Sequence, residues 1–129
     1  MKSIILSLCL SFGALLNVWA DTLQPSTTLP SMGKPEHLYS LKNGNNWYMN
    51  SYTSPTKDEK KSALFAFYSV AGKNNTYYLY NYSAGKWVGY SKASSYSNKE
   101  SFAVLSTTRN DGAYWAVTTL SNDAVQFQP

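Results

Sequence analysis

The sequence predicts an all-β domain of repeated hairpins, and three features of the 129-residue chain support this prediction. No window keeps the i, i+3, i+4, i+7 apolar stripe of an amphipathic helix. Short runs instead alternate with period two and are rich in Tyr, Phe, Trp, Val and Thr, which favour strands. Between these runs lie segments rich in Asn, Gly and Asp, which suit tight turns.

The expected strands are short and follow one another closely. In chain order they are His37–Lys42, Trp47–Tyr52, Leu64–Val70, Thr76–Tyr82, Trp87–Tyr90, Phe102–Ser106, Ala113–Thr119 and Ala124–Gln128. The turns between them, such as NGNN at 43–46 and RNDG at 109–112, carry residues that tolerate a positive φ. A series of hairpins is the simplest arrangement.

The first twenty residues are predicted to be a secretory signal peptide. Lys2 is followed by the uncharged apolar run SIILSLCLSFGALLNVWA, and Val18 and Ala20 occupy the small-residue positions of a cleavage site. A membrane-spanning helix is the alternative interpretation, although about 20 apolar residues would be needed. We expect cleavage after Ala20 and a periplasmic or extracellular protein with no stable membrane insertion.

Residues 21–35, after the expected cleavage site, are predicted to be a flexible leader. They read DTLQPSTTLPSMGKP, with three prolines and no apolar periodicity. The all-β domain is then expected to cover residues 36–129, a length that can bury a modest core. The only cysteine, Cys9, lies in the signal region, so the mature chain has neither a disulfide nor a thiol nucleophile.

Charge indicates no nucleic-acid partner. The chain has 11 Lys and Arg residues against seven Asp and Glu residues, and its one local group of lysines, at 57, 60 and 61, is interleaved with Asp58 and Glu59. This pattern is typical of a solvated loop. An anionic partner, such as a sulfated glycan or a membrane surface, is the alternative.

An internal repeat organises the domain. A shift of 37 positions lays Phe65–Val88 on Phe102–Val125, and a shift of 40 positions lays Trp47 on Trp87. The chain thus contains about two and a half copies of a unit of roughly 40 residues. Because barrel layers use matching positions from each unit, Trp47 and Trp87 are expected in the core, with exposed positions as the alternative.

Near-threefold repetition of a unit of short strands suits a β-trefoil, in which six strands form a barrel. The aromatic pair, strand, Ser-x-Gly-Lys turn and second strand of Tyr77–Val88 resemble the ricin-type β-trefoil, as do ALFAF and SFAVL at its core-strand position. More narrowly, the chain resembles the trefoil-like modules of secreted Bacteroidetes proteins. A full trefoil implies another strand after AVQFQP. The alternatives are an open barrel, a strand supplied by a partner and a shortened chain.

No catalytic, metal or cofactor site is expected. The single histidine, His37, stands beside Glu36, and most other acids fall in predicted turns, so no triad or facing pair of carboxylates is visible. A lone histidine does not make a metal site, and RNDG lacks the recurring acids of a calcium loop. We therefore expect that the protein is not an enzyme.

The tyrosines supply the expected binding site. Period two sends Tyr78, Tyr80 and Tyr82 to one face of their strand, where half-exposed rings can pack on the apolar face of a sugar. Ricin-type lectins combine an early Asp, an aromatic ring and a later Asn or Gln. This resemblance adds Asn81 with Tyr82, and Lys86 beside them, while the early Asp has no match. Half-buried tyrosines with only a packing role are the alternative.

The function expected from the sequence is that of a secreted, non-catalytic binding module. Its partner would be a glycan or another extracellular polymer, recognised by exposed aromatic rings. The alternative is a protein-interaction module that inhibits a secreted or surface protein or accepts a strand from one, because an open trefoil exposes strand edges.

Overall fold

The computed structural model describes residues 2–8, 15–17, 23–42, 45–92, 101–119 and 124–128. In these ranges the regular structure consists of strands and one short 3-10 helix, so the prediction of an all-β fold is confirmed. The elements are β1 (Lys2–Leu8), β2 (Leu15–Asn17), β3 (Tyr39–Lys42), β4 (Tyr48–Met49), β5 (Pro55–Thr56), η2 (Glu59–Lys61), β6 (Phe65–Ser69), β7 (Thr76–Asn81), β8 (Lys86–Lys92), β9 (Ser101–Ser106), β10 (Trp115–Thr119) and β11 (Ala124–Gln128). None of the described helical turns is long and apolar enough to cross a membrane.

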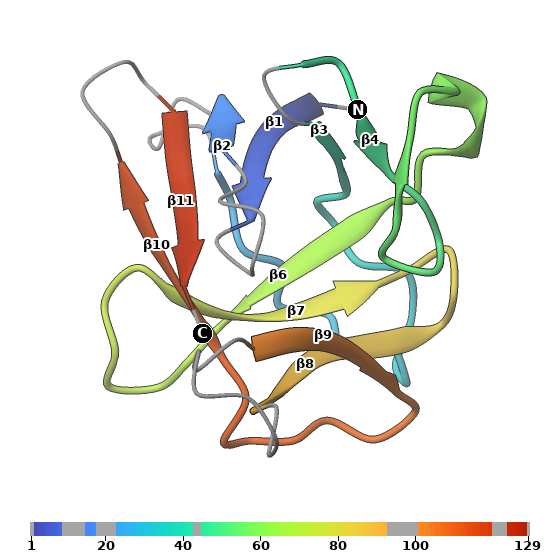
Figure 1. Cartoon of the computed structure of the whole chain (residues 1–129). Coiled ribbons are helices and arrows are strands. Elements are labelled where there is room, and N and C mark those ends of the chain that lie inside the picture. Colours follow the sequence, from blue (N-terminus) through green and yellow to red (C-terminus); the bar gives the residue numbers. More distant parts are fainter. Residues whose placement is uncertain are drawn as a thin grey trace.

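Six strands are joined in a circuit of hydrogen-bonded neighbours (Figure 1). The order is β3, β1, β11, β10, β7, β6 and back to β3. β1 runs parallel to β3 and to β11, whereas the other pairings in the circuit are antiparallel. β8 and β9 extend the sheet from β7, and β4 and β5 extend it from β3.

The N-terminal strands come from the segment with signal-peptide features. β1 lies between β3 and β11, and β2 pairs with β11 at Asn17 and Ala124. These two strands belong to the unprocessed chain. Secretion and removal of residues 1–20 stay predictions.

The core lies beneath the inner faces of β3, β6, β7, β8 and β10. Its buried members are Tyr39, Leu41, Ala63, Phe65, Phe67, Leu79, Val88 and Trp115. The ring of Phe67 makes edge contacts with Tyr39 at 5.8 Å and with Tyr77 at 5.9 Å between centroids. The indole Nε1 of Trp115 donates to the carbonyl of Val88 at 3.0 Å, so the polar atom of this buried ring has a partner.

The burial of the strands corrects the predicted repeat by one residue. A shift of 37 matches Phe67, which is 1% exposed, with Val104, which is 43% exposed, and matches half-buried Tyr78 with fully buried Trp115. A shift of 38 instead matches Phe67 with Leu105, which packs against the core. Because side chains alternate along a strand, a slip of one position reverses the face of every residue.

Residues 23–37 pack against the domain instead of standing apart from it. The backbone N–H of Ser26 donates to the carbonyl of Phe67 at 2.7 Å, and the Ser26 hydroxyl exchanges hydrogen bonds with the backbone of His37. The Tyr68 hydroxyl donates to the carbonyl of Thr28. Proline content predicted the lack of regular structure in this segment, but these long-range contacts had no local signal.

The Glu36 carboxylate closes the turn of this segment. It accepts hydrogen bonds from the backbone N–H groups of Thr27 at 2.7 Å and Thr28 at 2.6 Å, and from the Thr27 hydroxyl at 2.9 Å. Hydrogen bonding to the Thr28 side chain and to these backbone groups lowers the pKa of Glu36 to about 2.

Candidate functional site

The outer surface of β6, β7 and β8 carries a continuous row of aromatic rings. The register pairs Tyr68 with Tyr78 and Tyr80 with Trp87, so these four side chains lie on one face of the sheet. We call this set of four residues the aromatic face. The buried residues Leu79 and Val88 point to the opposite face, toward the core. The strand alternation expected for residues 77–82 is therefore present.

Three rings of the aromatic face, those of Tyr68, Tyr80 and Trp87, pack on one another. Trp87 contacts Tyr80 with 4.9 Å between ring centroids and Tyr68 with 5.4 Å. Tyr68 is only 4% exposed, and burial raises the pKa of its hydroxyl to about 12, with smaller contributions from Glu36 and Tyr80. Tyr68 is therefore the buried member of the aromatic face, whereas Tyr78, Tyr80 and Trp87 are half-buried.

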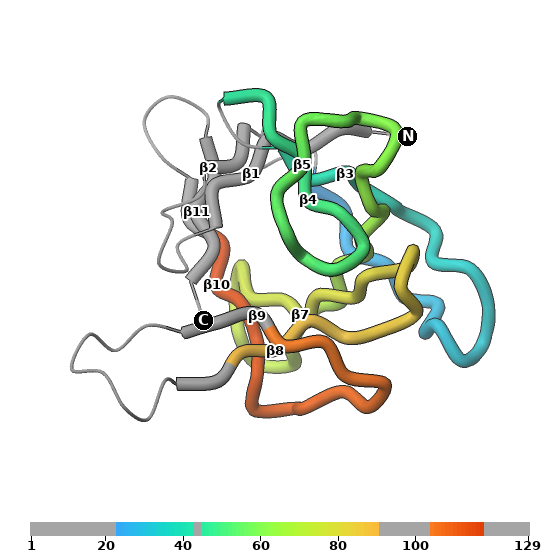
Figure 2. Tube along the Cα trace, turned by 45° about the vertical axis from the view of Figure 1, so that its right-hand side comes forward, coloured from blue at the N-terminus to red at the C-terminus, as the bar shows by residue number. Residues whose placement is uncertain are grey.

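The segment that joins β9 to β10 lies beside this face. In Figure 2 it is the orange stretch that passes outside β8 before the chain enters β10. Two tyrosines hold it, because the hydroxyl of Tyr78 donates to the carbonyl of Asp111 at 3.2 Å and that of Tyr90 donates to the carbonyl of Gly112 at 3.3 Å. Within the turn, the Asn110 side chain accepts the N–H of Gly112 at 3.0 Å. This is the RNDG turn expected from the sequence.

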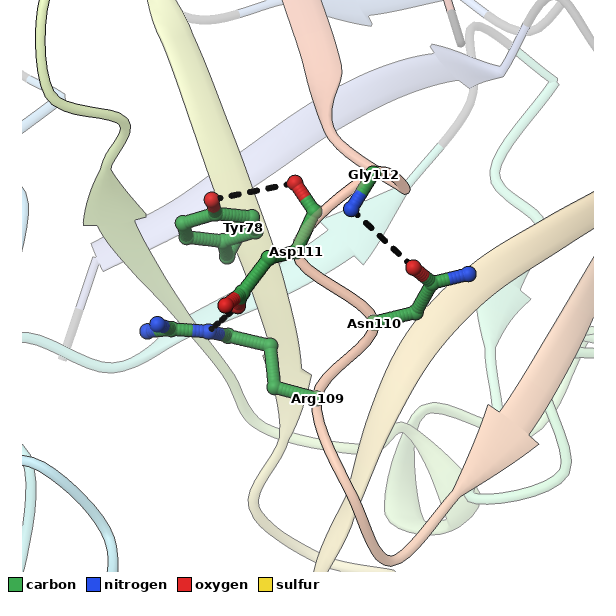
Figure 3. A network of polar contacts seen from close by, with 5 residues as sticks. All are labelled: Tyr78, Arg109, Asn110, Asp111 and Gly112. Atoms are coloured by element: carbon green, nitrogen blue, oxygen red, sulfur yellow. Dashed lines mark hydrogen bonds and ion pairs between the residues drawn. The ribbon is translucent and has the colours of Figure 1, made fainter.

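Arg109, at the start of this turn, covers part of the aromatic face. Its guanidinium carbon lies 4.3 Å from the centroid of the Tyr78 ring and 5.5 Å from that of Trp87, which is cation–π geometry. Its Nε donates to Asp111 Oδ1 at 2.7 Å, and Figure 3 shows the terminal nitrogens pointing away from that carboxylate. The pair is partly exposed, so its ionic contribution to stability is small. Its main effect is to hold the guanidinium over the ring.

A pocket of about 240 Å³ lies between this turn and the outer surface of β8 and β9. Its wall combines apolar groups with polar ones, and it includes Tyr78, Trp87, Gly89, Val104, Ser106, Thr108, Arg109 and Asn110. A Cβ atom added at Gly89 would lie 3.4 Å from the Cβ of Ala113. This distance is close to ordinary van der Waals contact, so the strand and the segment after the turn pack closely here.

The structure separates the five predicted ligand-binding residues. Tyr78 lines the pocket, Tyr80 packs against Trp87, and Tyr82 and Lys86 are exposed. Asn81 is fully buried. Its Nδ2 donates to the carbonyl of Ser51 at 2.9 Å, and its Oδ1 accepts from the N–H of Ala84 at 3.0 Å. A ligand cannot reach Asn81 in this structure, because its amide holds the turn after β7.

The two tryptophans expected in the core lie partly at the surface. Trp87 belongs to the aromatic face, and Trp47 is half-buried with the ammonium of Lys57 at 4.9 Å from its ring centroid. Trp115 takes the core position instead. Repetition alone indicated that Trp47 and Trp87 were equivalent, but it carried no information on which face of the sheet they share.

Several other rings have a cation of the chain over them. Lys42 lies 5.6 Å from the ring centroid of Tyr48, and Lys73 lies 4.8 Å from that of Tyr114. In the described part of the chain no cation lies over Tyr82, which is 39% exposed. Its ring is therefore open to contact with a ligand.

Sequence reasoning missed Arg109 and Trp87 as members of the site. The only local signal for Arg109 was its place beside a tight turn, which says nothing of the strand it covers.

Within the ranges described above, no group of three or more His, Asp or Glu residues could hold a metal ion. No protein-family model matches the chain, and neither the curated proteins nor the solved structures contain a significant match to it.

Proposed function

We propose that this chain is a secreted, non-catalytic module that binds carbohydrate at the pocket between the aromatic face and the Arg109 turn. The observation that carries the proposal is the pocket itself, where half-buried rings and hydrogen-bonding groups meet on one surface. Sugars need both, because their C–H faces are apolar and their hydroxyls are polar.

The size of the pocket favours a single sugar ring. Its volume of about 240 Å³ is below the range of about 300–1,000 Å³ that is typical of sites for drug-sized ligands. Trp87 and Val104 supply apolar wall, and the side chains of Ser106 and Asn110 supply polar wall. The exposed ring of Tyr82, at the end of the same strand as Tyr80, would contact further units of a longer glycan.

The terminal nitrogens of Arg109 offer donors to sugar hydroxyls. The guanidinium is already held in place by the Tyr78 ring and by Asp111, so binding would not need to order it. This preorganisation favours Arg109 as the residue that orients the ligand.

The proposal includes a trefoil-like fold and export from the cell. Five strands of the circuit, β3, β6, β7, β10 and β11, lie after Ala20, and with the hairpin extensions they support an open, trefoil-like barrel, since three repeated units of a trefoil share six barrel strands. Lys2, the apolar run after it and the small residues at 18 and 20 support export and cleavage.

A glycan array with the exported protein tests the proposal. We expect at least one glycan to bind, and we expect Arg109→Ala to weaken that binding by about tenfold or more, since a directed hydrogen bond to a charged group is lost. Tyr82→Ala and Tyr80→Ala should weaken it less, through loss of ring contacts. Lys73→Ala is the matched control, because it removes a cation from a ring outside the pocket.

Two results would contradict this function. One is a parent protein that binds no glycan at the highest soluble concentration. The other is equal glycan affinity of Arg109→Ala and Lys73→Ala, with both variants as stable as the parent in thermal unfolding.

A further inference from the structure

One strand fills the position between β3 and β11. β1 pairs with β3 through residues 2–5 and with β11 through residues 6–8. No direct pairing joins β3 to β11 among the described strands. β1 therefore closes a circuit that the other five strands leave open.

The strand that closes the circuit lies in the segment expected to be removed on export. Cleavage after Ala20 takes away β1 and β2 together, and it leaves β3 and β11 each with an unpaired edge. Free N–H and C=O groups along a strand edge bind a further strand. Here two such edges face one position, so an inserted segment would form hydrogen bonds on both of its sides.

The neighbours of this position define what fits it. Three residues of β3, Tyr39 to Leu41, are buried, and the segment now in place reads KSIILSL, with one charge. Since β1 is parallel to both neighbours, β3 and β11 run in the same direction. An inserted segment can therefore run parallel to both or antiparallel to both, and antiparallel pairing is slightly more stable per residue.

We propose that the exported, processed chain binds an extended and mostly apolar segment of a partner protein between β3 and β11, by strand addition. This inference depends on the proposed cleavage but not on glycan binding. A second copy of the chain is a less suitable occupant, because it would have to withdraw a strand from its own sheet. A partner with a free extended segment has no such requirement.

The test uses the protein exported from cells that express the full-length chain. Mass spectrometry establishes its N-terminus. The probe is a fluorescein-labelled synthetic peptide of residues 2–8, and the matched control is the same peptide with Ile4→Pro. The substitution Ala20→Phe in the full-length chain blocks cleavage and keeps β1 in place.

We expect the processed protein, which begins at Asp21, to bind the peptide saturably in fluorescence anisotropy. At saturation its melting temperature should rise by about 5 °C or more. The Ile4→Pro peptide should bind at least about tenfold more weakly, because proline removes a ladder donor. The uncleaved Ala20→Phe chain should not bind, because its own β1 occupies the position.

Four results would overturn the inference. They are an exported protein that retains residues 2–8, a processed protein that does not bind the peptide, equal affinity for the two peptides, and a stable dimer in light scattering that excludes the peptide. Each can occur whether or not glycans bind to the Arg109 pocket, so failure here is distinct from failure of the proposed function.

Discussion

The two halves of the sheet are assembled in different ways. In the half that contains β6 to β9, each strand pairs with the next one along the chain through an antiparallel hairpin. In the other half, strands from opposite ends of the sequence lie side by side, as Leu6 and Val125 do. The half with β6 to β9, the hairpin half, can form from local sequence. The half in which β1 lies between β3 and β11 depends on contacts between distant segments. Loss of β1 would therefore change the proposed strand position and leave the hairpins of the candidate site in place.

The largest expected effect is on the core beneath the hairpin half. Phe67 is 1% exposed and contacts the rings of Tyr39 and Tyr77. We expect Phe67→Ala to lower the free energy of unfolding by about 3–5 kcal/mol, through lost burial and the cavity left behind. Urea denaturation followed by tryptophan fluorescence measures this. Ser69→Ala, at an exposed position of the same strand, should change the value by less than about 0.5 kcal/mol. A similar loss from both variants would contradict the burial of the Phe67 side chain as the cause of the loss.

The next effect separates a structural residue from a binding residue in the same hairpin. Asn81→Ala removes two partly buried hydrogen bonds, to Ser51 and Ala84, and leaves their backbone groups without this partner. We expect a loss of about 1–3 kcal/mol in the free energy of unfolding, with unchanged glycan affinity for the folded fraction. Tyr82→Ala should show the opposite pattern. If Asn81→Ala weakened binding without any loss of stability, the assignment of Asn81 to the turn would be wrong.

The hairpin half was also the more predictable half. The strand expected at Thr76–Tyr82 is β7, and that expected at Trp87–Tyr90 lies within β8, because alternation and turn residues are local signals. The same alternation assigned Asn81 to the face opposite Tyr80, which is the buried face. The choice of Asn81 as a ligand contact followed the family resemblance and not the strand pattern.

What the sequence could not predict depends on distant contacts. Arg109 over Tyr78 and Ser26 against Phe67 join separate segments, and nothing in the local pattern of either segment encodes the other. Trp87 was wrongly expected in the core for a related reason. The repeat indicates that Trp47 and Trp87 occupy equivalent positions, but it does not indicate which face of the sheet their side chains share. The place of β1 in the sheet was not predicted either, because the composition of residues 1–20 indicated a signal peptide and not a strand.

A smaller effect concerns the turn that covers the aromatic face. The hydroxyls of Tyr78 and Tyr90 donate to the carbonyls of Asp111 and Gly112. We expect Tyr78→Phe and Tyr90→Phe each to lower the free energy of unfolding by at most about 0.5–1.5 kcal/mol, because these bonds are exposed. Hydrogen exchange should quicken at Ala113, whose N–H bonds within the turn. Tyr82→Phe is the control, and equal exchange at Ala113 in all three variants would show that these hydroxyls do not hold the turn.

The smallest effect tests the turn that Glu36 closes within residues 23–37. The pKa of Glu36 is lowered to about 2 from the usual 4.5, so its ionised form is the one that the folded chain favours. Its contribution to the stability of this turn is therefore fully present above about pH 4.5 and is lost as the pH falls through about 2. In an NMR titration, the amide signals of Thr27 and Thr28 should shift with a midpoint near pH 2. Glu36→Gln should remove that transition and leave the signals of the hairpin half unchanged. A midpoint near 4.5 would mean that the carboxylate does not bind these amides, and that residues 23–37 are held by their other contacts, among them those of Gln24, Ser26 and Tyr68.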